Sequence, residues 1–180
     1  MPIQPDSQEM RELAANLKIF ILDVDGVLTD GGIILIGNDL EAKRFDVQDG
    51  MGIRLARASG LEVAIITSRD SVVVQRRAME LGIESVIQGI SNKLDALDTL
   101  LDKYGVTPRQ AAYVGDDLQD IPIMDRIGLP IAVQNAVQLV KDHSLYVTSA
   151  LGGHGAVREA VEWLLELRTG RDAVYKTITG

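Results

Sequence analysis

The chain has 180 residues with 46% hydrophobic and 24% charged side chains, which suits a single globular domain, residues 1–180, with a full hydrophobic core. A formal net charge of −8 argues against a nucleic-acid partner, and no apolar stretch approaches the roughly 20 residues that cross a bilayer, so we expect no membrane partner either. The polar residues 1–8 are unlike a secretory signal and cysteine is absent, which together favour a cytoplasmic protein.

The first elements in chain order are a lead-in, a buried strand and a hairpin. The lead-in, residues 1–17, is expected to hold one short helix, and the apolar run at 18–24 is typical of a central strand buried on both faces. Two further runs, 33–36 and 40–47, flank the turn residues Gly37-Asn38-Asp39 and predict a β-hairpin after that strand.

Beyond the hairpin, segments typical of helices alternate with short apolar runs typical of strands. We expect helices at 49–59 (capped by Asp49), 70–81, 92–104, 118–127, 137–142 and 156–167. We expect strands at 61–66, 85–87, 110–114, 129–133 and 145–147. Such alternation predicts an α/β fold with a doubly wound, Rossmann-like, mainly parallel sheet. Residues 169–180 are then a C-terminal tail whose role the sequence leaves open.

Two aspartates, Asp23 and Asp25, stand where the first predicted strand ends. Open α/β sheets bind their ligands beyond the carboxyl ends of the strands. Two carboxylates so close repel each other unless a cation or a shared proton relieves them. Gly26 lets the backbone turn sharply and approach a bound group. The arrangement predicts a metal-bound phosphate site.

Three more carboxylates, Asp116, Asp117 and Asp120, follow the strand predicted at 110–114. Asp117 could cap the next helix and Asp120 could lie in its first turn, where the helix dipole favours anions. Asp116 has no such structural role. A few oxygen ligands with water or phosphate completing the shell point to Mg²⁺, and the absence of neighbouring His or Cys argues against zinc.

Thr67-Ser68-Arg69-Asp70 and Lys93 are the remaining candidates for phosphate binding. The hydroxyl of Thr67 and the amides of the following helix could hold phosphate oxygens, although the same residue types also cap helices. Lys93 lies in the first turn of a predicted helix, where the dipole disfavours a cation, and the alternative is a solvated surface lysine.

Taken in order, DVDGVLTD (23–30), Thr67, Lys93 and GDDLQD (115–120) resemble the haloacid dehalogenase superfamily of phosphotransferases. The resemblance covers residues from about 18 to 167. It implies an Mg²⁺-dependent phosphomonoesterase that works through an aspartyl-phosphate intermediate. In that mechanism Asp23 is the nucleophile, and Asp25 protonates the leaving oxygen and then activates water.

The resemblance also implies a role for each remaining candidate. Mg²⁺ would be held by Asp23, the backbone carbonyl of Asp25 and Asp116, with Asp117 or Asp120 in support. Thr67 and Lys93 would stabilise the transferring phosphoryl oxygens and, with Ser68 and Arg69, would bind the substrate.

Only a hairpin and one helix fit between Asp30 and Thr67, and no large insertion follows, so the chain resembles the capless subfamily without a large cap domain. The stretches DVDGVLTDGG, FDVQDGMGI, SRDS and GGHGAVRE are similar to members acting on 3-deoxy-D-manno-octulosonate 8-phosphate (KDO 8-phosphate). The resemblance implies a small phosphorylated sugar acid as substrate and a homotetramer assembled through the hairpins. Apolar residues at 33–36 independently favour burial in an oligomer.

Arg69 bears on the choice of substrate, because a guanidinium can pair bidentately with the carboxylate of an octulosonate. A related phosphatase acting on keto-deoxy-nonulosonate 9-phosphate has glutamate there, whereas the structural alternative is a surface arginine paired with Asp70 or Glu80. The subfamily often has lysine where His154 stands, so the role of His154 stays open. The functional alternatives are a related phosphatase acting on keto-deoxy-nonulosonate 9-phosphate or another sugar phosphate, and a non-enzymatic, receiver-like phosphoacceptor domain.

Overall fold

The computed structural model describes residues 7–37, 40–170 and 176. Its centre is a six-stranded sheet with the order β5-β4-β1-β6-β7-β8, in which every neighbouring pair is parallel. The strands are β1 (Ile19–Leu22), β4 (Glu62–Ile66), β5 (Ser85–Ile87), β6 (Ala111–Gly115), β7 (Leu129–Ala132) and β8 (Tyr146–Val147). The predicted parallel sheet is confirmed.

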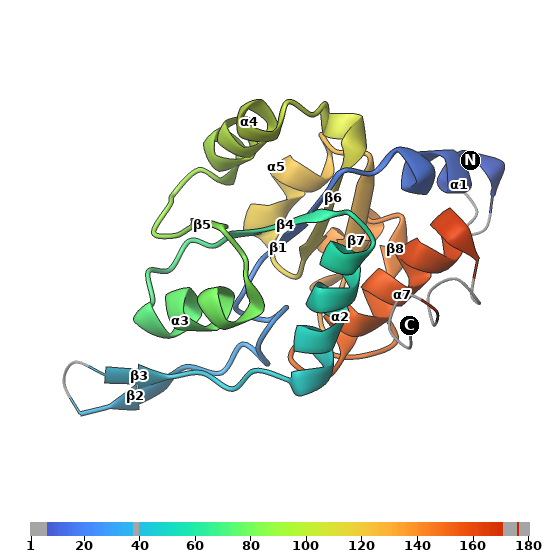
Figure 1. Cartoon of the computed structure of the whole chain (residues 1–180). Coiled ribbons are helices and arrows are strands. Elements are labelled where there is room, and N and C mark those ends of the chain that lie inside the picture. The colour runs from blue at the N-terminus through green and yellow to red at the C-terminus, as the bar shows by residue number, and fades with distance from the viewer. Residues whose placement is uncertain (1–6, 38–39, 171–175, 177–180) are drawn as a thin grey trace.

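Helices cover both faces of this sheet, as a doubly wound fold requires. In Figure 1, α2, α3 and α7 lie on one side of the sheet, α4 and α5 lie on the other, and α1 runs beside α7. The helices are α1 (Gln8–Asn16), α2 (Val47–Ala58), α3 (Val72–Leu81), α4 (Lys93–Tyr104), α5 (Ile121–Met124), α6 (Gln138–Asp142) and α7 (Ala156–Thr169), with short 3₁₀ turns at Pro108–Gln110 and Leu118–Asp120. None of the helices in the described part of the chain combines the length and apolarity needed to cross a membrane.

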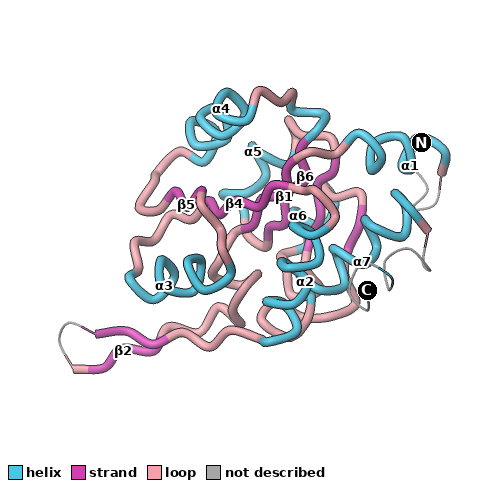
Figure 2. Tube along the Cα trace, in the orientation of Figure 1, coloured by secondary structure: helices cyan, strands magenta, loops and turns pink. Residues whose placement is uncertain are grey.

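The hairpin β2 (Ile34–Ile36) and β3 (Leu40–Ala42) forms a separate antiparallel pair that extends away from the sheet (Figures 1 and 2). The turn residues Asn38 and Asp39 lie outside the described residues. Among the described residues, the helices and strands between β1 and β4 are this hairpin and α2 alone, which agrees with a fold that has no large cap domain.

The position of β1 in the sheet determines where a ligand can bind. All four of its residues are fully buried, because apolar side chains meet helices on both faces. Its neighbours are β4 on one side and β6 on the other, so crossovers leave this point in opposite directions. Such a switch point opens a crevice at the carboxyl ends of the strands, where Asp23 and Asp116 follow β1 and β6.

Two helix predictions differ from the structure. The cap of α2 is Asp46, whose Oδ1 accepts from the N–H of Gln48 at 2.7 Å, and not Asp49. The helix expected at 118–127 is a 3₁₀ turn followed by the short α5, because Pro122 is tolerated only in the first turn of a helix.

Candidate active site

The turn after β1 brings the backbone of Gly26 close to the side chain of Asp116. The carbonyl of Val24 accepts hydrogen bonds from the N–H groups of three residues in the turn, and Gly26 has a φ of +89°. A Cβ built on Gly26 would lie 1.9 Å from Oδ2 of Asp116. Glycine is therefore required here on two grounds, the left-handed backbone and the close approach of a carboxylate.

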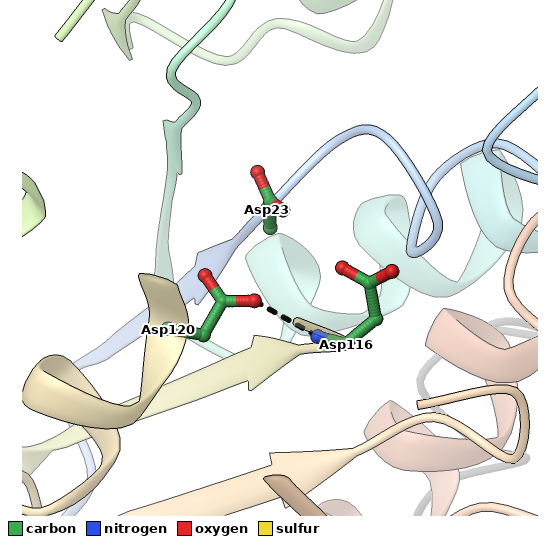
Figure 3. A group of neighbouring side chains, drawn as sticks. All are labelled: Asp23, Asp116 and Asp120. Atoms are coloured by element: carbon green, nitrogen blue, oxygen red, sulfur yellow. Dashed lines mark hydrogen bonds between the residues drawn. The ribbon is translucent and has the colours of Figure 1, made fainter. Parts of the chain in front are cut away.

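Carboxylates from separate parts of the chain converge at this point, as Figure 3 shows. Asp23, Asp116 and Asp120 each offer an oxygen within 4.8 Å of the others. Asp120 uses both of its oxygens in hydrogen bonds. Its Oδ2 accepts from the backbone N–H groups of Asp116 at 2.9 Å and Asp117 at 3.1 Å. Asp120 therefore stabilises the loop that begins at Asp116. The carboxylates of Asp23 and Asp116 are then the ones that can bind a cation.

The donor set fits Mg²⁺. Oδ1 of Asp116 is buried and has no hydrogen-bond partner among the described residues, and the cluster offers only oxygen ligands. Burial, opposed by Lys93 and reinforced by Asp120, raises the pKa of Asp23 to about 7. Burial and the nearby Asp23 raise the pKa of Asp116 to about 8. A divalent cation would relieve the cost of these crowded charges.

Lys93 lies beneath the cluster with only 3% of its surface exposed, so the surface-lysine alternative is wrong. Its Nζ is 3.1 Å from Oδ1 of Asp23 and 2.6 Å from Oδ1 of Asp120. Burial opposes its charge, but these two carboxylates outweigh burial and raise the pKa of Lys93. Lys93 therefore neutralises part of the acidic cluster from below.

Tyr113 belongs to this network, and sequence reasoning missed it. Its hydroxyl accepts from Nζ of Lys93 at 3.1 Å and donates to Oδ1 of Asp120 at 2.6 Å. Burial and the charge of Asp120 raise its pKa well above the usual range. The only signal in the sequence was a phenol within the apolar run of β6.

A pocket of about 210 Å³ opens above the acidic cluster. Its lining residues are Asp23, Asp25, Gly31, Thr67, Ser68, Arg69, Asp116, Asp117 and Gln119. Seven of the nine residues nominated from the sequence thus meet in one pocket, whereas Lys93 and Asp120 are not among the lining residues. Asp117 is exposed and caps the following 3₁₀ turn through the N–H of Leu118, as its structural alternative predicted.

Thr67 does not cap the helix that follows it. Ser71 caps α3, with its Oγ accepting from the N–H of Val74, so the capping alternative for Thr67, Ser68 and Asp70 is wrong. Thr67 is buried at the end of β4, and its Oγ1 accepts from the N–H of Arg69 at 3.4 Å. Its own O–H stays available to a ligand in the pocket.

Two charged residues, one directly after the hairpin and one after β4, flank Asp25 at the mouth of the pocket. Lys43, which sequence reasoning missed, has a buried side chain and forms an ion pair with Oδ1 of Asp25. Arg69 places Nε 3.6 Å from Oδ2 of Asp25 and Nη2 3.2 Å from Oε2 of Glu41. The ion-pair partners of Arg69 are therefore Asp25 and Glu41, and not Asp70 or Glu80, which the surface-arginine alternative proposed.

His154 lies on the surface near this mouth, in the glycine-rich segment before α7. Its Nε2 is 2.7 Å from Nη2 of Arg44, which also lies 3.5 Å from Oδ2 of Asp30. The histidine thus contacts the hairpin stem, and its role stays open.

The comparisons with known proteins agree with this geometry. The sequence profile of the haloacid dehalogenase-like hydrolases matches residues 85–158. The chain is 48% identical over 161 residues to the 3-deoxy-D-manno-octulosonate 8-phosphate phosphatase KdsC of Escherichia coli K12, covering 89% of this chain and 86% of that protein.

Solved structures give the same picture. The Moraxella catarrhalis 3-deoxy-D-manno-octulosonate 8-phosphate phosphatase, crystallised with magnesium, phosphate and KDO, superposes with a TM-score of 0.90 at 43% identity, covering 95% of this chain and 98% of that one. The cobalt-bound Haemophilus influenzae phosphatase gives 0.86 at 37% identity, covering 89% and 94%. These relatives favour the enzyme prediction over the receiver-like alternative, and the chain belongs to the haloacid dehalogenase superfamily of hydrolases.

Proposed function

We propose that this chain hydrolyses KDO 8-phosphate to KDO and inorganic phosphate with Mg²⁺ as cofactor. The observation that carries the proposal is the meeting of Asp23 and Asp116 within 4.8 Å, on the floor of a pocket that Thr67 and Arg69 also line. A relative of 48% identity that bears this activity in its name supports the choice of substrate.

Asp23, Asp116 and the backbone carbonyl of Asp25 would hold the Mg²⁺ ion. Bound there, the ion neutralises phosphate charge, so that a carboxylate can attack an anion. Asp120 supports this arrangement through its hydrogen bonds to the backbone N–H groups of Asp116 and Asp117.

Asp23 attacks phosphorus, the bond from phosphorus to the sugar oxygen breaks, and Asp25, in its protonated form, gives its proton to the leaving oxygen. Water then attacks the phosphorus of the aspartyl phosphate, Asp25 takes the proton, and Asp23 and phosphate are released. Thr67 donates to a phosphoryl oxygen in both steps, and the Lys93 ammonium holds the Asp23 carboxylate from 3.1 Å.

Arg69 is the residue that we assign to the substrate carboxylate. Its guanidinium lines the pocket, and 42% of its side chain is exposed, so it can meet a ligand from solvent. The two parallel N–H donors of a guanidinium match the two oxygens of a carboxylate better than they match a single hydroxyl group of a ligand.

We further propose that the protein is a cytoplasmic homotetramer that assembles through the hairpin. The support is a row of solvent-exposed apolar side chains, Ile33, Ile34, Leu35, Ile36 and Leu40, each at least half exposed in the single chain. Light scattering on the wild type and on a Leu35→Glu variant tests this assembly. We expect four subunits for the wild type and fewer for the variant, and a monomeric wild type would contradict it.

The activity is tested by phosphate release with Mg²⁺ from three substrates: KDO 8-phosphate, keto-deoxy-nonulosonate 9-phosphate and glucose 6-phosphate. We expect the highest kcat/KM for KDO 8-phosphate, and none for the isosteric Asp23→Asn control. Arg69→Ala should raise KM for the two acids but not for glucose 6-phosphate. Equal efficiency on all three substrates would refute the proposed specificity.

A further inference from the structure

The guanidinium of Arg69 is already engaged by two carboxylates of the protein. Its Nη2 lies 3.2 Å from Oε2 of Glu41, and its Nε lies 3.6 Å from Oδ2 of Asp25. Glu41 comes from β3 of the hairpin, whereas Arg69 follows β4 of the central sheet. The hairpin therefore supplies a counter-ion to the residue that we assign to the substrate carboxylate.

Glu41 is well suited to stay charged in this position. Its side chain is only 17% exposed. The nearby Ser71 side chain is the main influence that lowers the pKa of Glu41, with further contributions from Arg69 and the charge of Lys43. At neutral pH the Arg69–Glu41 contact is therefore an ion pair.

A substrate carboxylate must compete with that ion pair. A bidentate carboxylate takes two N–H groups from one edge of a guanidinium, and Glu41 occupies Nη2 while Asp25 faces Nε. Two carboxylates beside one another also repel. A hollow of about 550 Å³, lined by Glu41 together with Leu35, Leu40 and Val72, adjoins the pair in the single chain.

We propose that Glu41 is the internal counter-ion that a substrate carboxylate displaces from Arg69, so that Glu41 sets the affinity for phosphorylated acids. This inference rests on the proposed phosphatase function and adds a specificity-determining residue to it. Glu41 does not line the pocket above Asp23 and touches the site through Arg69.

The test is Glu41→Gln, which keeps the shape of the side chain and removes its charge. We expect KM for KDO 8-phosphate to fall about two- to fivefold, the range of a partly exposed ion pair, while kcat holds. KM for glucose 6-phosphate, which has no carboxylate, should not change. The difference should shrink in 0.5 M salt because screening weakens the pair.

Two control variants sharpen the result. Glu62→Gln removes an exposed charge at the opposite end of β4 and should leave both KM values unchanged. In an Arg69→Ala background, Glu41→Gln should lose its effect, because the pair no longer exists.

The outcomes separate the two proposals. A KM for KDO 8-phosphate that is unchanged or higher in Glu41→Gln, or that moves in parallel with glucose 6-phosphate, overturns the role of Glu41 alone. Wild-type protein that releases no phosphate from KDO 8-phosphate overturns the proposed function and this inference together.

Discussion

Removing Mg²⁺ should make the stability of the protein fall as pH rises from 5 to 8. In the folded chain the pKa of Asp23 is about 7 and that of Asp116 about 8, against an ordinary value of 3.8 for each. Above pH 4 an unfolded chain has released protons that the folded chain still holds. The unfolded state therefore binds fewer protons, and its free energy falls relative to the native state as pH rises.

The size of this effect follows from the shift at Asp23, which is nearly fully buried. Between pH 5 and 7 Asp23 alone contributes a loss of about 2 kcal/mol, because the slope of about 1.4 kcal/mol per pH unit falls by half as the pH reaches the pKa of the folded state. For a chain of this size this contribution alone should lower the melting temperature by roughly 6 °C. Asp116, whose pKa in the folded chain is about 8, adds a loss of similar size over the same range and extends it toward pH 8.

Mg²⁺ should remove this dependence, because it binds the ionised carboxylates of the folded state and adds stability where both are charged. The assay is thermal unfolding of the protein in EDTA and in excess Mg²⁺ across pH 5 to 8. Asp116→Asn should flatten the decline in EDTA, since it removes one crowded charge. A melting temperature in EDTA that is constant or rises over this range would refute the electrostatic reasoning.

Three substitutions test the contacts that support the site. In the wild type, the two carboxylate oxygens of Asp49 accept from the N–H groups of Gly155 at 3.2 Å and Arg158 at 3.1 Å. Asp49→Asn leaves only one acceptor oxygen for these two donors, so urea unfolding should show a loss of about 1–2 kcal/mol in the free energy of unfolding. Tyr113→Phe removes the hydroxyl between Lys93 and Asp120 and should cost about 1–3 kcal/mol, which an unchanged urea midpoint would contradict. Gly152→Ala would bring a Cβ to 1.7 Å from the carbonyl oxygen of Gly26, so both the melting temperature and phosphate release should drop; full activity would show that the turn after β1 can shift freely.

The sequence predicted the sheet and most of the pocket because both depend on local patterns. Buried apolar runs marked β1, β4 and β6, and polar residues directly after them marked the carboxyl edge where the site lies. Parallel pairing then brings Asp23 and Asp116 together without further information, since Leu22 and Val114 are register partners.

Contacts between distant segments could not be predicted in this way. Asp49 looks like a helix cap in the sequence, yet its carboxylate binds the start of α7, more than a hundred residues away. Lys43 is one of many charged residues in a short hairpin, and only the fold turns its amine toward Asp25. The position of a charged side chain depends on how the hairpin packs, which periodicity does not encode.

Trapping the covalent intermediate tests the central claim that Asp23 is the nucleophile. Borohydride reduces an aspartyl phosphate to homoserine, and peptide mass spectrometry after quenching a reaction with Mg²⁺ and KDO 8-phosphate identifies the converted residue. We expect homoserine at position 23 alone, and none when substrate is omitted. Conversion of Asp25 or Asp116 instead, or turnover without any converted aspartate, would contradict the mechanism.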